Sequence, residues 1–228
     1  MDLQLQLASK GHALTYASPE ISGLPKWAVW QNQAYGTTFE PVSIAYNKRL
    51  LPADAVPQSH ADMIRLPKRK PDLFKEKIAT FDPEKSGVGF LMMTQDAKCS
   101  RSFGIWPKRW DRAAPKFTPA PAPCWKRSAP AKHYLAYNII GSYVLLRQKK
   151  DPAMGLVLPK DYTLVFSRVA FISQDRAQPQ RGEALLGLHS FQARTDGDVR
   201  EVFGLLAAQR RPGKYYRGGP DQRAPARR

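Results

Sequence analysis

The sequence predicts an α/β protein with a largely parallel sheet. Three observations support this prediction: short apolar and β-branched runs typical of buried strands, helical segments between those runs, and turn residues at the junctions. The 228 residues are enough for one large domain or two smaller lobes. The chain has no long uncharged apolar run, so we expect no transmembrane helix.

The individual elements follow from apolar runs and their boundaries. We expect a short helix from Met1 to Lys10 that stops at Gly11, and a helix from His60 to about Arg65 that is capped by Ser59. A turn is expected at 35–38, and another at Asn138. Strands are expected at 27–30, 39–46, 77–81, 134–137, 155–158 and 163–172, and further helices after 77–81 and at 139–147.

The positive charge of the chain is concentrated in two segments. Lys and Arg number 36 against 19 Asp and Glu, which gives a net charge of +17. Segment 99–132 has 8 basic residues and 1 acidic residue, and segment 174–228 has 11 and 6. These segments are compatible with a basic nucleic-acid-binding protein, whose binding would weaken steeply with salt. A solvated basic surface is the more common explanation for such segments, and we expect no nucleic-acid partner.

The junction after the strand at 77–81 is the first candidate site. Ser86, Gly87 and Gly89 lie where this strand passes into a helix. Backbone N–H groups at the positive end of a helix form a natural cradle for an anion. A capped helix whose glycines allow close packing explains the pattern equally well. The junction lacks the lysine that ends a P-loop, so the pattern does not support nucleotide hydrolysis.

Other polar residues are weaker candidates for ligand binding. Tyr137, Asn138 and Tyr162 could line a polar cleft or chelate a hard metal, although tyrosines more often simply pack. Arg168 is either a charge partner for a ligand or a structural residue. The sequence shows no nucleophile beside a general base and no His or Cys pattern with metal-ligand spacing. We therefore predict no enzyme and no cofactor, and leave the presence of a metal open.

Three long runs resemble a known family. They are LPKWAVWQNQAYGTTFEPVSIAYNKRLLP (24–52), KIATFDPEKSGVGFLMMTQDAK (77–98) and HYLAYNIIGSYVLLRQKKDPAMGLVLPKDYTLVFSRVAFI (133–172). These runs resemble the bacterial extracellular solute-binding proteins of ABC transporters, in the group similar to ferric-iron-binding proteins. The resemblance implies the fold of the type II periplasmic binding proteins, with two α/β lobes joined by crossover strands.

The resemblance also implies a function and a place in the cell. A member of this family captures a solute in the cleft between its lobes and delivers it to a membrane permease. The expected solute is a small anion or an anion–metal complex, with ferric iron as one candidate metal, and the expected state is a monomer. The family is periplasmic. The beginning of this chain resembles a point inside the first lobe, so we expect the N-terminal part of lobe 1 and the signal peptide to be missing, and the chain as written to be cytoplasmic.

The family's elements match particular positions of this chain. Its anion-binding helix start matches 82–89, and its second-lobe cleft turn matches Tyr137, Asn138, Gly141 and Ser142. Its crossover strands match 35–46 and 162–170. We therefore expect residues 1–38 to be a remnant of lobe 1 with the first crossover, 39–160 to form lobe 2, and 161–228 to form the second crossover and the return to lobe 1.

The two basic segments match nothing in the family as they are written. Codons compatible with residues 99–132, read two bases later, give a segment similar to the family's helix, strand and Thr/Ser-rich loop at this place. The same offset from Gln174 onward again gives a family-like segment. We hypothesise that both segments are out of frame, which would make this a truncated, frame-disrupted chain. Their charge and both cysteines, Cys99 and Cys124, would then be by-products.

Overall fold

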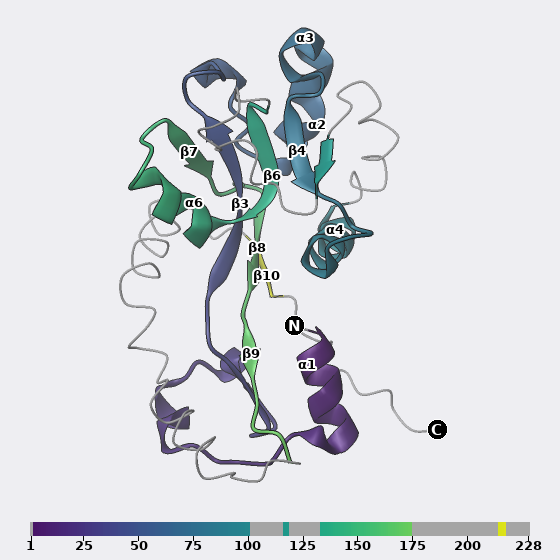
Figure 1. Ribbon diagram of the computed structural model, residues 1–228, viewed down its shortest axis with the longest axis vertical. Coiled ribbons are helices and arrows are strands. Elements are labelled where there is room, and N and C mark those ends of the chain that lie inside the picture. Colours follow the sequence, from purple (N-terminus) through teal and green to yellow (C-terminus); the bar gives the residue numbers. More distant parts are fainter. Residues whose placement is uncertain (1, 101–115, 119–132, 175–213, 218–228) are drawn as a thin grey trace. The chain divides into compact units, whose positions relative to one another are not determined.

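The computed structural model describes residues 2–100, 116–118, 133–174 and 214–217 (Figure 1). These residues fall into two compact units, and the chain changes unit after Glu40 and after Val165. The predicted lobes and crossovers, with boundaries at 38/39 and 160/161, stay predictions. Most of the segments 99–132 and 174–228 lies outside the described residues, so the hypothesis about their reading frame is not addressed by the structure.

The first unit contains a helix and a small antiparallel sheet. Helix α1 (Asp2–Leu7) continues into a π-helical turn, η1 (Ala8–His12), which contains Gly11 at a φ of 88°. That left-handed φ favours glycine and agrees with the predicted stop at this residue. The sheet has the order β1-β2-β9. Its strands are β1 (Val29–Trp30), β2 (Ala34–Gly36) and β9 (Val169–Ala170). The turn expected at 35–38 was wrong for residues 35 and 36, because they pair with β9.

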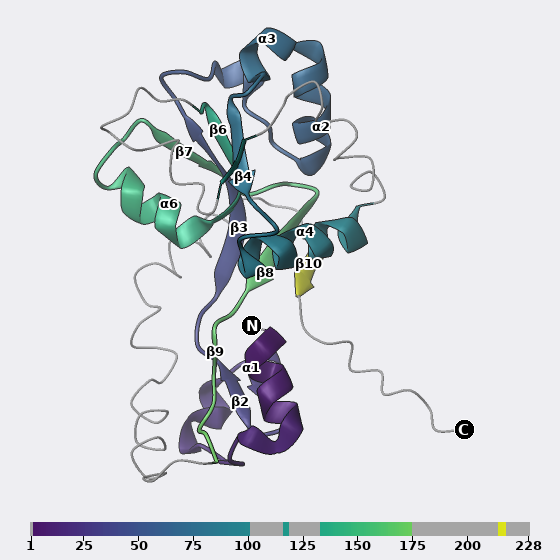
Figure 2. The same cartoon turned by 45° about the vertical axis from the view of Figure 1, so that its right-hand side comes forward.

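The second unit is built on a seven-stranded sheet (Figure 2). The strand order is β10-β8-β3-β6-β4-β5, and β7 also pairs with β3. The strands are β3 (Glu40–Asn47), β4 (Ile78–Phe81), β5 (Lys116–Thr118), β6 (Leu135–Ile140), β7 (Met154–Val157), β8 (Tyr162–Phe166) and β10 (Lys214–Arg217).

Strand directions in this sheet are mixed. Strand β4 runs parallel to β5 and β6, and β8 runs parallel to β10. Strand β3 runs antiparallel to both β6 and β7. The prediction of a largely parallel sheet was therefore wrong for β3. A buried apolar run shows that a strand lies inside a sheet, but direction depends on the connections, which the run does not encode.

The described residues of the second unit form four α-helices. They are α2 (His60–Arg69), α3 (Pro71–Phe74), α4 (Gly87–Cys99) and α6 (Gly141–Gln148). The predicted cap of α2 is confirmed, since the Ser59 hydroxyl accepts a hydrogen bond from the Asp62 N–H at 3.1 Å. The predicted end near Arg65 was wrong: α2 continues through Pro67, which costs the helix one internal hydrogen bond but packs as a buried residue.

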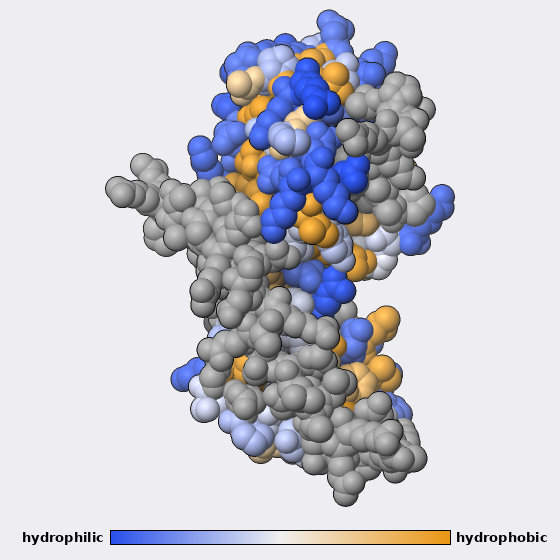
Figure 3. Space-filling model, turned by 60° about the vertical axis from the view of Figure 1, so that its left-hand side comes forward, coloured by the Kyte–Doolittle hydropathy of each residue, from blue (hydrophilic) through white to orange (hydrophobic). Residues whose placement is uncertain are grey.

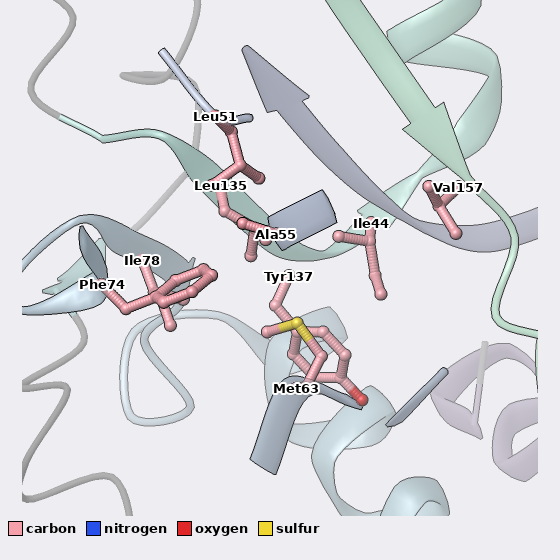
Figure 4. Close-up of a cluster of buried hydrophobic side chains, with 9 residues drawn as sticks. All are labelled: Ile44, Leu51, Ala55, Met63, Phe74, Ile78, Leu135, Tyr137 and Val157. Atoms are coloured by element: carbon pink, nitrogen blue, oxygen red, sulfur yellow. The ribbon is translucent and has the colours of Figure 1, made fainter. Parts of the chain in front are cut away.

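The main core of the second unit lies between its sheet and the helices α2 and α3. Ile44, Ile78 and Leu135 contribute from three strands, and Met63 and Phe74 contribute from the helices (Figure 4). Figure 4 also shows the ring of Tyr137 beside Met63, with its hydroxyl directed away from the apolar cluster. A polar group that leaves a core in this way needs a hydrogen-bond partner, and that partner is part of the site described below.

Most of the described surface of the second unit is hydrophilic on the face drawn in Figure 3, with smaller apolar areas between the polar side chains. None of the helices in the described part of the chain has the length and apolar character needed to cross a membrane.

Candidate functional site

Two helices of the second unit begin at the same edge of its sheet. Strands β4 and β6 are parallel neighbours, paired through Ile78 with Leu135 and Ala79 with Ala136. Helix α4 follows β4, and helix α6 follows β6 directly. Because parallel strands end at one edge, both helices start there, and Figures 1 and 2 both show α4 and α6 at that end of the sheet. Helix starts at such an edge are the usual place for an anion.

The start of α4 is capped by a side chain. The Ser86 hydroxyl accepts a hydrogen bond from the Gly89 N–H at 3.1 Å, and the Ser86 carbonyl accepts one from the Phe90 N–H at 2.9 Å. The N–H groups of Gly87 and Val88 have no acceptor within the helix, because the first turn of a helix lacks preceding carbonyls. The donors available to an anion are therefore these two backbone groups and the Ser86 O–H, because the cap uses only an acceptor lone pair of the hydroxyl oxygen.

The two glycines of this helix start have different reasons to be glycine. A Cβ at position 89 would lie 2.4 Å from the Cβ of Phe81, so Gly89 is required by the packing of α4 on β4. A Cβ at position 87 would have no atom within 4 Å. Packing thus accounts for Gly89, and Gly87 lies in open space where a ligand can approach its N–H group.

The start of α6 has no side-chain cap. Its flanking residue is Ile140, and a Cβ at Gly141 would lie 3.1 Å from the carbonyl oxygen of Pro41. Glycine therefore lets α6 begin close against β3. The uncapped first turn leaves further N–H groups at the edge where α4 also starts.

A buried carboxylate lies behind this edge. Asp96 of α4 has 0 % exposure and accepts hydrogen bonds from Tyr137, Asn138 and Tyr162. The Tyr137 hydroxyl and the Asn138 amide both donate to Oδ2 at 2.8 Å, and the Tyr162 hydroxyl donates to Oδ1 at 3.0 Å. The three donor residues are only 2 %, 5 % and 5 % exposed. The structure thus brings three of the predicted site residues together, with a carboxylate of the chain as their partner.

A β-bulge makes this arrangement possible. Ser43 of β3 pairs with Ile139, and Ala45 pairs with Ala136, so that two residues of β6 lie opposite Ile44 alone. Adjacent residues of a regular strand point to opposite faces, yet Tyr137 and Asn138 reach the same carboxylate oxygen. Asn138 has a φ of 59°, a left-handed conformation that Asn tolerates better than most residues. The turn expected at Asn138 was therefore wrong, because β6 continues through the bulge to Ile140.

A histidine connects Asp96 to a second acidic residue. His60 Nε2 lies 3.8 Å from Asp96 Oδ1, and His60 Nδ1 lies 2.8 Å from Asp161 Oδ1. The His60 ring stacks on Tyr162 with a centroid separation of 3.7 Å. Asp161 Oδ2 also accepts the backbone N–H of His60 at 2.9 Å, at the first turn of α2. Asp161 thus places its carboxylate against both the ring of His60 and the positive end of α2.

Burial controls the titration of this cluster. Desolvation raises the pKa of Asp96, and the nearby His60 and the three donated hydrogen bonds lower it by less. Burial and the Asp96 charge raise the pKa values of both Tyr137 and Tyr162. Burial also raises the pKa of the Cys99 thiol to about 11, which leaves it protonated and a poor nucleophile at neutral pH.

Sequence reasoning missed Asp96, His60 and Asp161. A signal for Asp96 was present: Gly89, Met92 and Asp96 recur at helical spacing and are the buried residues of α4. A carboxylate in such a row must have partners inside the fold. His60 and Asp161 lie about a hundred positions apart, so no local pattern joins them.

Arg168 lies in the first unit and has a partner within the chain. Its Nε donates to Glu40 Oε1 at 2.8 Å, and its backbone N–H donates to Thr38 at 2.9 Å. The Arg168 side chain is 56 % exposed, while that of Glu40 is 9 % exposed. This pair gives Arg168 the structural explanation considered from the sequence, and its predicted contact with a solute stays a prediction.

Within the described ranges, no group of three or more His, Cys, Asp or Glu side chains is arranged to hold a metal ion. Ligand contacts were also predicted from the sequence, and they stay predictions for Ser86, Gly87, Gly89, Tyr137, Asn138 and Tyr162.

Comparison with solved structures relates the chain to binding proteins. It is similar to the substrate-binding protein of an ABC transporter from Agrobacterium tumefaciens, with 31 % identity, a TM-score of 0.75 and coverage of 88 % of this chain and 59 % of that one. The periplasmic binding protein AfuA from Actinobacillus pleuropneumoniae, with fructose-6-phosphate bound, matches at 16 % identity and a TM-score of 0.65, over 86 % of this chain and 64 % of AfuA. Iron-bound HitA from Pseudomonas aeruginosa matches at 14 % identity and a TM-score of 0.60, over 83 % and 64 %.

These matches confirm the predicted α/β fold at the level of periplasmic binding proteins. The first two of these proteins are described as binding proteins and not as enzymes, in agreement with the sequence prediction. The chain spans less than two thirds of the length of each of these structures. No protein-family model and no curated protein matches the chain.

We expect Asp161 to stabilise the fold in a pH-dependent way. Partial burial acts to raise its pKa, but the hydrogen bonds and charge of His60 outweigh burial and leave the pKa lowered. A lowered carboxyl pKa contributes stability that is fully present above the ordinary Asp value of about 3.9 and is lost as the pH falls through the folded-state value. In urea denaturation, the free energy of unfolding of wild type should therefore exceed that of Asp161→Asn at pH 5 to 7. This difference should close below about pH 4. A difference in unfolding free energy that stays constant across this pH range would contradict the stabilising role of the ionised Asp161.

Proposed function

We propose that this chain acts as the solute-binding component of an ABC importer. The observation that carries the proposal is its 31 % identity, over 88 % of its length, to a substrate-binding protein of an ABC transporter. The proposed partners are a small anionic solute or an anion–metal complex and a membrane permease, and the proposed compartment is the periplasm. The second unit would contribute the two helix starts that contact the solute.

The chemistry of the helix starts favours an anion. The exposed N–H groups of Gly87 and Val88, together with the uncapped start of α6, offer donors and partial positive charge at one edge of the sheet. Phosphate and carboxylate groups suit such donors. AfuA, whose structure carries fructose-6-phosphate, is an example of a similar fold with a phosphorylated ligand.

The buried tyrosines make ferric iron the less favoured solute. Ferric iron is a hard cation and binds a tyrosine best as the phenolate. Tyr137 and Tyr162 instead donate their hydroxyl hydrogens to Asp96, and their raised pKa values oppose ionisation. HitA binds iron in a similar fold, but at 14 % identity its ligands do not transfer to this chain. An anion without a metal is therefore the solute that we favour.

Gly87→Pro tests the anion contact directly. Proline removes the N–H at the first helical position, where it is well tolerated, and the extended Ser86 can precede it. The expected result is a loss of roughly tenfold or more in affinity for inorganic phosphate or fructose-6-phosphate by calorimetry, because a hydrogen bond to a charged group is lost. The matched control is Gly87→Ala, which keeps the N–H and places its Cβ in open space.

Two results would contradict the anion contact. One is that wild type binds neither probe at millimolar concentration. The other is that proline and alanine at position 87 reduce affinity equally.

We further propose that segments 99–132 and 174–228 are out of frame. The concentration of positive charge in these segments and the family-like sequences at the offset support this proposal. Sequencing the locus in several isolates should show a base lost after the codon of Lys98, a base gained before His133 and a further break after Ser173. Intact reading frames across all three positions would refute it.

A further inference from the structure

The carboxylate of Asp96 joins three separate elements of the second unit. It projects from α4 and accepts hydrogen bonds from β6 and β8, with His60 of α2 also close by. Both donors from β6 share the oxygen Oδ2, while Oδ1 accepts from Tyr162 of β8 and also lies 3.8 Å from His60 Nε2. The two oxygens therefore divide the contacts between the two strands.

The contact with β6 falls on the bulge, close to the start of α6. Only Ile139 and Ile140 separate Asn138 from Gly141, the first residue of α6. A bulge bends its strand and so sets the direction of whatever follows. The bend depends on two residues that are both tied to Asp96, one of them in the left-handed conformation.

The side chain of Asn138 depends on Asp96 in particular. Its Nδ2 donates to Asp96 Oδ2, and its buried Oδ1 has no hydrogen-bond partner among the described residues. A buried amide with one of its two ends unsatisfied is costly, so its position is held by the bond that it does make.

Burying a carboxylate at position 96 carries a large desolvation cost. Apolar side chains in place of the carboxylate and its three donors together would avoid the desolvation of a charge, and such joint replacements are often neutral or stabilising. Stability alone therefore does not explain Asp96. A carboxylate offers what an apolar group cannot, namely two acceptor oxygens that fix several donors in defined directions.

We infer that Asp96 is a positioning residue that fixes the start of α6 relative to the start of α4. It holds the bulge of β6 from the body of α4, so that the two helix starts keep one spacing. The inference rests on the proposed function, which assigns the contact with the anion to these two helix starts. Asp96 does not itself reach the solute, because it is fully buried.

Two substitutions at position 96 test the inference in the full chain. Asp96→Ala removes both acceptor oxygens. Asp96→Asn keeps one, which can accept from Tyr137 and Asn138 while its amide faces the Tyr162 hydroxyl oxygen. Hydrogen exchange without solute should be at least roughly fivefold faster in peptides covering 139–148 in Asp96→Ala, in line with the loss of one net hydrogen bond, and near wild type in Asp96→Asn.

A matched pair of tyrosine variants keeps the test valid even if Asp96→Ala does not fold. Tyr137→Phe and Tyr162→Phe each remove one hydroxyl from the same carboxylate, but only Tyr137 lies on β6. Exchange in 139–148 should rise in Tyr137→Phe and stay at the wild-type rate in Tyr162→Phe. Equal rates in both variants, or in Asp96→Ala and wild type, would overturn the inference.

Affinity for inorganic phosphate then connects positioning to binding. Variants with faster exchange in 139–148 should bind phosphate at least fivefold more weakly, well below their melting temperatures, and Asp96→Asn should restore the affinity. Unchanged affinity in those variants would overturn the inference. If wild type itself does not bind phosphate, the proposed anion fails, and the solute-free exchange comparison alone decides whether Asp96 positions the start of α6.

Discussion

The parallel pairing of β4 with β6 is the constraint on which the site depends. Parallel neighbours end at the same edge, so the helices that follow them must also begin there. Antiparallel pairing of the same strands would put the two helix starts at opposite edges. The apolar residues that fix this register, Ile78 and Leu135, belong to the main core, so the packing that stabilises the second unit also places its candidate site.

Behind that edge, the interior of the second unit is polar, although an apolar interior would avoid the free-energy cost of desolvating a charge. Asp96, three donors and His60 are all buried, and each donor satisfies part of the carboxylate. Such a network is stable only when its members are paired, which makes its geometry strict. The bulge at Tyr137 and Asn138 is a consequence of this strictness, since a regular strand could bring only one of the two side chains to Asp96.

Local signals in the sequence predicted local structure well. The cap at Ser59, the strand that precedes the Ser86 junction and the helix after it are confirmed, because each depends on residues within a few positions. Features set by distant residues were missed. The direction of β3 depends on connections, and the bulge at Asn138 depends on Asp96, which is 42 positions earlier. Tyr137, Asn138 and Tyr162 meet at Asp96, and this common partner could be found only once α4, β6 and β8 were placed together.

The most direct test of the account is a titration of the ¹⁵N-labelled full chain with inorganic phosphate, followed by amide chemical shifts. We predict that the largest changes occur at the two helix starts, at the amides of Gly87, Val88, Gly141 and Ser142. Largest changes elsewhere, for example at the exposed basic residues Lys68 and Arg69 of α2, or no changes at millimolar phosphate, would contradict the claim that this edge of the sheet binds an anion.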